Sequence, residues 1–222
     1  MFAKVIVAED IDSINSSILN SLNELNVVEK QSAKYCDEAF TKIQKALHDG
    51  SPYELLITDL SFKEDHIKNK LKSGEALIEA VKNIQPDIKI IVLSIEEKTF
   101  RIKNLFTKYG INSFVLKGRN SIPELKKAIE MVFEGEERYL SPNLNYILQN
   151  KMVHEIDDYD IQLLLLLSYG VPQEKMEERF VDLGIKPSSK SSIEKRINKL
   201  KTYFKANNTI HLVAIAKDLG LI

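Results

Sequence analysis

Five polar residues directly follow or close apolar runs of strand length in this sequence: Glu9, Asp10, Asp59, Ser94 and Lys117. Three carboxylates that lie close together repel one another, so a site built from them needs a cation. Oxygen ligands in this number favour a hard divalent ion, Mg2+ in a cell. The hydroxyl and the ammonium group suit an incoming phosphoryl group, with one Asp as the nucleophile that forms an aspartyl phosphate.

The elements that must position these residues are strands that alternate with helices. We expect strands at residues 5–8, 27–28, 55–58, 88–93 and 114–116, each followed by an amphipathic helical pattern. Strict alternation indicates an α/β fold: a parallel sheet with helices on both faces and right-handed crossovers. The carboxyl ends of its strands face the crevice where such sheets bind ligands. Because four of the five strand ends carry a polar group, we expect these groups to meet at one edge.

The set Glu9-Asp10, Asp59, Ser94 and Lys117 resembles the five-residue phosphoacceptor site of response-regulator receiver domains. The resemblance implies a flavodoxin-like, five-stranded receiver domain over residues 1–134, with strand order 2-1-3-4-5. It also implies that Asp59 is the phosphorylated residue. The implied Mg2+ ligands are Glu9, Asp10, Asp59 and the backbone carbonyl of Ser61. Ser94 and Lys117 would bind the phosphoryl oxygens, and Phe114, three residues before the lysine, matches the switch aromatic of the family.

Two features depart from the receiver pattern. Gly118 follows Lys117 where the family usually has proline, so we expect a trans peptide bond at this position. The stretch from Asp59 to Gly74 is longer than usual, and its residues 60–73 include many lysines. This long loop could order on phosphorylation, contact a partner, or remain a solvated surface loop.

The second half of the chain shows only helical patterns after a predicted linker at residues 135–155, in which residues 143–152 could form a short helix. Residues 186–205 hold seven Lys or Arg residues and one acid, Glu194, most of them on the third of four expected helices. A basic helix of this kind can enter a major groove. The helix order over residues 156–222 resembles the LuxR-type helix-turn-helix domain. The expected DNA-binding residues are Lys190, Ser192, Lys195, Arg196, Lys199 and Lys201.

The composition is that of an ordinary soluble protein: 222 residues, 44% of them hydrophobic, with a net charge of -1. The single cysteine, Cys36, excludes an internal disulfide and a cysteine-based metal cluster. The longest apolar run, residues 163–167, is too short to span a bilayer. The start of the chain leads directly into a strand pattern rather than a signal peptide. We therefore expect a cytoplasmic protein without membrane association.

Together these features predict a two-component response regulator that is phosphorylated by a sensor histidine kinase, binds double-stranded DNA and forms a homodimer when active. It would be a transcriptional regulator and not an enzyme. One alternative is a receiver coupled to a helical protein-interaction domain, for which the acidic Glu174, Glu177 and Glu178 leave room. Another is a DNA-binding regulator that works without phosphorylation. A hydrolase with an aspartyl intermediate would need a substrate pocket or cap, which the sequence does not indicate.

Overall fold

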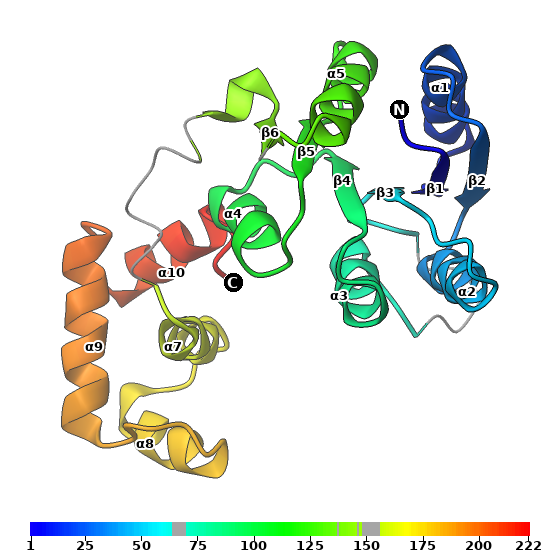
Figure 1. The fold of residues 1–222 in the computed structure, drawn as a ribbon. Helices are drawn as coiled ribbons and strands as arrows, with labels where there is room; N and C mark the ends of the chain where they lie inside the picture. The colour runs from blue at the N-terminus through cyan, green and yellow to red at the C-terminus, as the bar shows by residue number, and fades with distance from the viewer. Residues whose placement is uncertain (64–69, 137, 146, 148–155) are drawn as a thin grey trace. The chain divides into compact units, whose positions relative to one another are not determined.

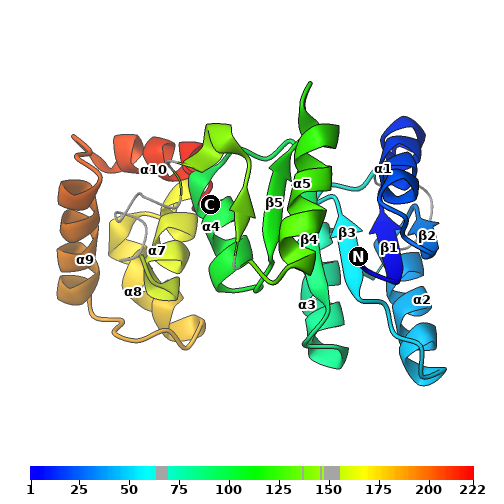
Figure 2. The ribbon, with the colours of Figure 1, turned by 45° about the horizontal axis from the view of Figure 1, so that its top comes forward.

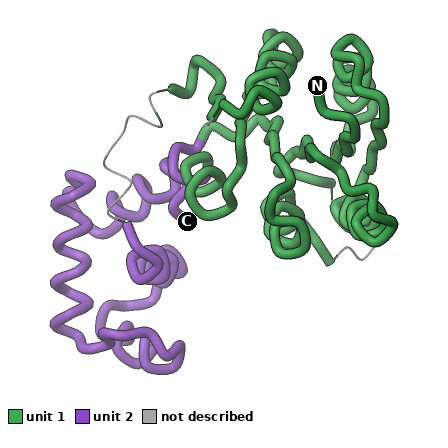
Figure 3. The backbone as a smooth tube through the Cα atoms, in the orientation of Figure 1, with its two compact units in different colours: residues 1–97, 102–148 green, residues 98–101, 149–222 purple. Residues whose placement is uncertain are grey.

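The computed structural model describes residues 1–63, 70–136, 138–145, 147 and 156–222. The chain divides into two compact units (Figure 3): the first comprises residues 1–97 and 102–148, and the second comprises residues 98–101 and 149–222. Each unit has its own hydrophobic core.

A parallel sheet forms the centre of the first unit (Figure 1), with the strand order β2-β1-β3-β4-β5-β6. Its strands are β1 (Lys4–Ala8), β2 (Glu29–Ala33), β3 (Leu55–Thr58), β4 (Lys89–Ser94), β5 (Ser113–Leu116) and β6 (Tyr139–Leu140). Every neighbouring pair is parallel. The predicted α/β fold and the order 2-1-3-4-5 are therefore confirmed.

Helices cover both faces of this sheet (Figures 1 and 2). One core joins α1 (Asp12–Glu24) and α5 (Ser121–Phe133) to side chains such as Val5 and Val7 of β1. The other core joins α2 (Cys36–His48), α3 (Gly74–Ile84) and α4 (Thr99–Thr107) to Ile6 and Ala8 of the same strand. Successive residues of a strand point to opposite faces, so an unbroken apolar run is what a strand covered on both sides requires.

Two strands differ from the sequence-based expectation. The second strand was expected at residues 27–28, but β2 begins at Glu29 and alternates exposed with more buried positions. Val27 is buried beside α1, whereas Val28 is 80% exposed. β2 lies at an edge of the sheet, where one side of a strand meets water and an apolar run is not needed.

The sheet has six strands rather than five because β6 forms within the residues expected to be a linker. The hydroxyl of Ser141, directly after β6, accepts a hydrogen bond from Leu116 N (2.9 Å) and donates one to the carboxylate of Glu124. The segment continues in the 3-10 helix η1 (Pro142–Leu144), and the side chains of Leu144 and Ile147 join the core. Most of the helix considered at residues 143–152 lies outside the described residues.

Residues 156–222 form four helices, as the sequence predicts: α7 (Asp158–Ser168), α8 (Gln173–Asp182), α9 (Lys190–Tyr203) and α10 (Thr209–Asp218). Their apolar faces share one core that includes Leu163, Phe180, Ile197 and Leu212. The basic helix α9 begins at Lys190, where the Ser189 hydroxyl caps it by accepting from Ser192 N. Of the helices in the described ranges, none is both long and apolar enough to cross a membrane.

Candidate functional site

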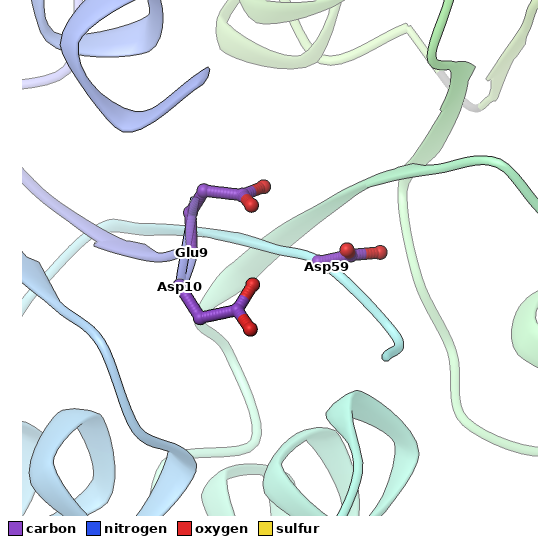
Figure 4. A group of neighbouring side chains, drawn as sticks. All are labelled: Glu9, Asp10 and Asp59. Carbon is purple, nitrogen blue, oxygen red and sulfur yellow. The ribbon is translucent and has the colours of Figure 1, made fainter. Parts of the chain in front are cut away.

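Three carboxylates gather where β1 and β3 end side by side. Glu9 and Asp10 follow β1 and Asp59 follows β3, and each offers an oxygen within 4.8 Å of the others (Figure 4). Only 1% of Glu9 and 6% of Asp59 are exposed. Burial raises the pKa of Glu9 above its ordinary value, although the hydrogen bond and positive charge of Lys117 counteract this shift. A cluster of acidic oxygens with this little access to water fits the oxygen preference of a hard divalent cation.

Lys117 projects from the end of β5 into the acidic cluster. Its ammonium group donates hydrogen bonds to Glu9 Oε2 at 2.8 Å and to Asp59 Oδ2 at 2.7 Å. Burial lowers the pKa of the lysine, but these two bonds and their charges outweigh it, so the pKa is raised. The lysine thus remains a cation and offsets part of the acidic charge.

The backbone around Asp59 is held closely by the start of α3. Leu60 N donates to Asp59 Oδ1 at 2.6 Å, and Gly74 N donates to Leu60 O at 2.9 Å. A Cβ atom on Gly74 would lie only 2.0 Å from Asp59 O, so this position requires glycine. The sequence shows a glycine before the third helix, but only the structure shows that it fixes the position of Asp59.

Two further predicted site residues lie on the neighbouring strands: Ser94 is the last residue of β4, and Phe114 lies within β5. Ser94 is 1% exposed, and its hydroxyl lacks a hydrogen-bond partner among the residues that the structure describes. A buried hydroxyl without a partner is costly, which favours an acceptor that arrives with a ligand. Phe114 is fully buried and pairs with Val92 on one side and Leu140 on the other. The strand ends therefore bring together Glu9, Asp10, Asp59 and Lys117, and Ser94 ends the neighbouring strand β4.

The loop after β3 contributes a contact that the sequence did not indicate. Lys63 N donates to Asp10 Oδ2 at 2.9 Å, and Ser61 forms an isolated antiparallel bridge with Ser73. The central residues of the long loop, 64–69, lie outside the described part of the chain. The peptide bond between Lys117 and Gly118 is trans, as expected.

The six expected DNA-binding residues all lie on α9, in three different environments. Lys190, Lys195 and Lys199 are exposed, whereas Ser192 and Lys201 are half-buried. Arg196 differs from the others because its guanidinium forms ion pairs with Asp157 and Asp160 of the same unit. The basic charge of α9 therefore lies partly on its open surface and partly against α7.

The described part of the chain combines a parallel α/β unit that carries an acidic edge with a helical unit. No family model matches the chain, and no curated protein matches it. Solved structures do match. A structure described as two RcsB dimers bound to two parallel DNAs shares 21% identity, with 98% of each chain covered and a TM-score of 0.64. RcsB from Salmonella enterica serovar Typhimurium, bound to promoter rprA in the presence of phosphomimetic BeF3-, shares 21% identity over 98% of this chain and 99% of that one, with a TM-score of 0.62.

The first unit also matches the isolated REC domain of RcsB from the same organism. The identity is 24%, the coverage is 65% of this chain and 97% of that chain, and the TM-score is 0.52. These likenesses show that the chain has the two-part fold of the RcsB structures, with an α/β unit followed by a helical unit.

Proposed function

We propose that this protein is a response regulator of a two-component phosphorelay, phosphorylated on Asp59 and acting as a DNA-binding transcriptional regulator. The observation that carries the proposal is the nearly buried acidic cluster bridged by Lys117 at the carboxyl edge of the sheet. A sensor histidine kinase is the proposed donor, and the active form is a homodimer. The protein turns over no external substrate.

The residues of the cluster divide the chemistry between them. A carboxylate oxygen of Asp59 forms the new O–P bond as the P–N bond of the phosphohistidine donor breaks. Lys117 exchanges a carboxylate for a phosphoryl oxygen, and the unpartnered hydroxyl of Ser94 donates to another. Glu9, Asp10, Asp59 and the carbonyl of Ser61 would hold Mg2+, which would supply positive charge to offset the incoming oxygens.

The same residues supply a switch. A phosphoryl group adds about 1.5 to 2 negative charges at neutral pH. Movement of Ser94 toward it opens space into which Phe114 can follow, which reshapes the surface formed by residues 95–117. Moving a two-state equilibrium from 1:99 to 99:1 needs about 5.5 kcal/mol of differential stabilisation. A few charge-assisted hydrogen bonds are of that order.

The output is assigned to the second unit, residues 156–222, with residues 135–155 as the connection. The exposed lysines of α9 form a basic helical surface on a chain with a net charge of only -1. Such a surface suits the phosphates that flank a major groove. Several of the RcsB structures with this fold are described as bound to DNA, which supports the same output here.

The test is DNA binding by the full-length protein, with and without beryllofluoride and Mg2+, at two salt concentrations. We expect affinity to rise with beryllofluoride and to fall steeply with salt, because phosphate contacts release counterions. Asp59→Asn should keep the fold and the salt dependence but lose the response to beryllofluoride. A wild-type response in this variant would refute the role of Asp59.

A second function is favoured by the acidic surface of α8. Glu174, Glu177 and Glu178 are all exposed there, and carboxylates repel DNA. If the protein binds no DNA at either salt concentration, the helical unit is a protein-interaction domain. If it binds DNA equally with and without beryllofluoride, it is a phosphorylation-independent DNA-binding regulator.

A further inference from the structure

Within the described residues, Arg196 is the one expected DNA-binding residue whose charged group forms ion pairs in its own unit. Its Nη2 donates to Asp157 Oδ2 at 2.6 Å and to Asp160 Oδ2 at 2.7 Å, and its Nε donates to Asp160 Oδ1. The side chain of Asp160 is only 1% exposed, and that of Arg196 is 24% exposed. The guanidinium therefore forms a bidentate pair with a buried carboxylate, a geometry that lysine cannot reproduce.

The two carboxylates also build the start of α7. Asp157 caps the helix by accepting from Asp160 N at 2.9 Å, and Asp160 accepts from Asp157 N at 3.2 Å. Burial raises the pKa of Asp157, but hydrogen bonds and the charge of Arg196 outweigh it and lower the pKa. Arg196 is thus attached to a rigid helix terminus that is itself fixed by reciprocal hydrogen bonds.

Tyr159 connects the same helix terminus to the segment that enters α9. Its ring centroid lies 5.9 Å from the guanidinium carbon of Arg196, and its hydroxyl donates to Pro187 O at 2.8 Å. The ring also packs edge-to-face against Phe180 of α8, with the centroids 5.1 Å apart. One turn of α7 therefore holds the middle of α9, the chain before α9 and helix α8.

Charge and helix geometry both separate Arg196 from the open surface of α9. Ile193, Ile197 and Leu200 form the buried side of the helix, and Arg196 lies next to that side, three residues after Ile193. One guanidinium opposes two carboxylates, so the group as a whole carries a net negative charge and does not attract phosphate. Lys195 and Lys199, in contrast, are exposed.

We infer that Arg196 is a positioning residue that fixes the orientation of α9 through Asp157 and Asp160, and that it makes no contact with DNA. The inference rests on the proposed DNA-binding function. It predicts that losing Arg196 weakens DNA binding by misplacing the exposed lysines, without changing the number of phosphate contacts.

The test is fluorescence anisotropy with a labelled DNA duplex and the full-length protein, over a series of KCl concentrations. The variants are Arg196→Lys, Asp160→Asn, their combination, and the matched exposed controls Lys195→Gln and Lys199→Gln. Circular dichroism melting checks that each variant is folded at the assay temperature. We expect Arg196→Lys and Asp160→Asn each to weaken binding about tenfold, or about 1.4 kcal/mol, with an unchanged salt slope.

The sign of the Asp160→Asn effect separates the two roles of Arg196. If Arg196 contacted phosphate, removing its competing carboxylate would strengthen binding. A positioning role weakens it, and the double variant then loses no more than either single one because both changes break the same contact. A lysine control that contacts phosphate should reduce the slope of log K against log salt by about 0.9.

Three results would overturn the inference. The first is a gain of affinity in Asp160→Asn, which would make Arg196 a phosphate contact. The second is a lower melting temperature with unchanged affinity in both variants, which would make the ion pair merely structural. The third is the absence of salt-dependent binding by the wild-type protein, which would remove the proposed function as well. The first two leave that function standing.

Discussion

Replacing Gly74 with alanine should disturb the candidate phosphoacceptor site by displacing the backbone of Asp59 and Leu60. The added Cβ would lie 2.0 Å from Asp59 O, 2.8 Å from Leu60 Cα and 2.9 Å from Asp59 C. All three are backbone atoms, so no side chain can rotate away, and the segment must shift by about 1 Å or more to reach ordinary contact. Overpacking of this kind costs about 3 kcal/mol, of which better helix propensity recovers about 1 kcal/mol.

We therefore expect Gly74→Ala to lower the free energy of unfolding by about 2 kcal/mol and to weaken the response to beryllofluoride. Urea unfolding followed by circular dichroism measures the first effect, since the chain has no tryptophan. The matched control is Gly118→Ala, beside Lys117, where a Cβ would meet nothing within 4 Å. This control should stay within about 0.5 kcal/mol of wild type. Wild-type stability and response in Gly74→Ala would refute the close approach of α3 to Asp59.

Two further predictions concern polar side chains inside the first unit: Lys117 and Ser141. In Lys117→Met, Glu9 and Asp59 face each other without a cation, so the already raised pKa of Glu9 should rise further. Because the pKa of Glu9 in the folded state lies above 4.5, the free energy of unfolding falls as pH rises from 4.5 through that pKa. Urea unfolding should therefore show that Lys117→Met loses more stability relative to wild type at pH 8 than at pH 5. An equal loss at both pH values would contradict this account. In Ser141→Ala, the carboxylate of Glu124 and a backbone N–H of β5 lose their partner, which should cost about 1–3 kcal/mol in the same assay. An unchanged midpoint would show that water replaces the hydroxyl.

The sequence predicted those parts of the fold that an apolar strand or a helical pattern specifies. β1, β3, β4 and β5 are buried on both faces, so their composition alone locates them and their polar ends. β2 and β6 could not be located in this way. β2 is a polar edge strand, and the two residues of β6 are ordered by their contacts with β5 and the core. Whether such segments form strands depends on tertiary packing, which the local sequence does not show.

The candidate site shows the same division between local and tertiary information. The residue types at the strand ends were sufficient to predict the acidic cluster, because parallel topology brings those ends together. The net charge of α9 did not show that Arg196 is paired with Asp157 and Asp160, since these partners lie 39 and 36 residues away. The one sequence signal for this pairing is the position of Arg196 next to the buried side of its helix, three residues after Ile193.

β5 contains the predicted switch aromatic, Phe114, and leads directly into Lys117, and β6 pairs with the same strand. Phe114 pairs with Leu140, Phe114 O accepts from Ser141 N at 3.1 Å, and the hydroxyl of Ser141 accepts from Leu116 N. If Lys117 exchanges a carboxylate for a phosphoryl oxygen as proposed, direct hydrogen bonds connect its strand to residues 139–141 and would transmit an adjustment to them. These residues begin the proposed connection to the helical unit. In the proposed switch, a change at Asp59 thus reaches the start of that connection through β5.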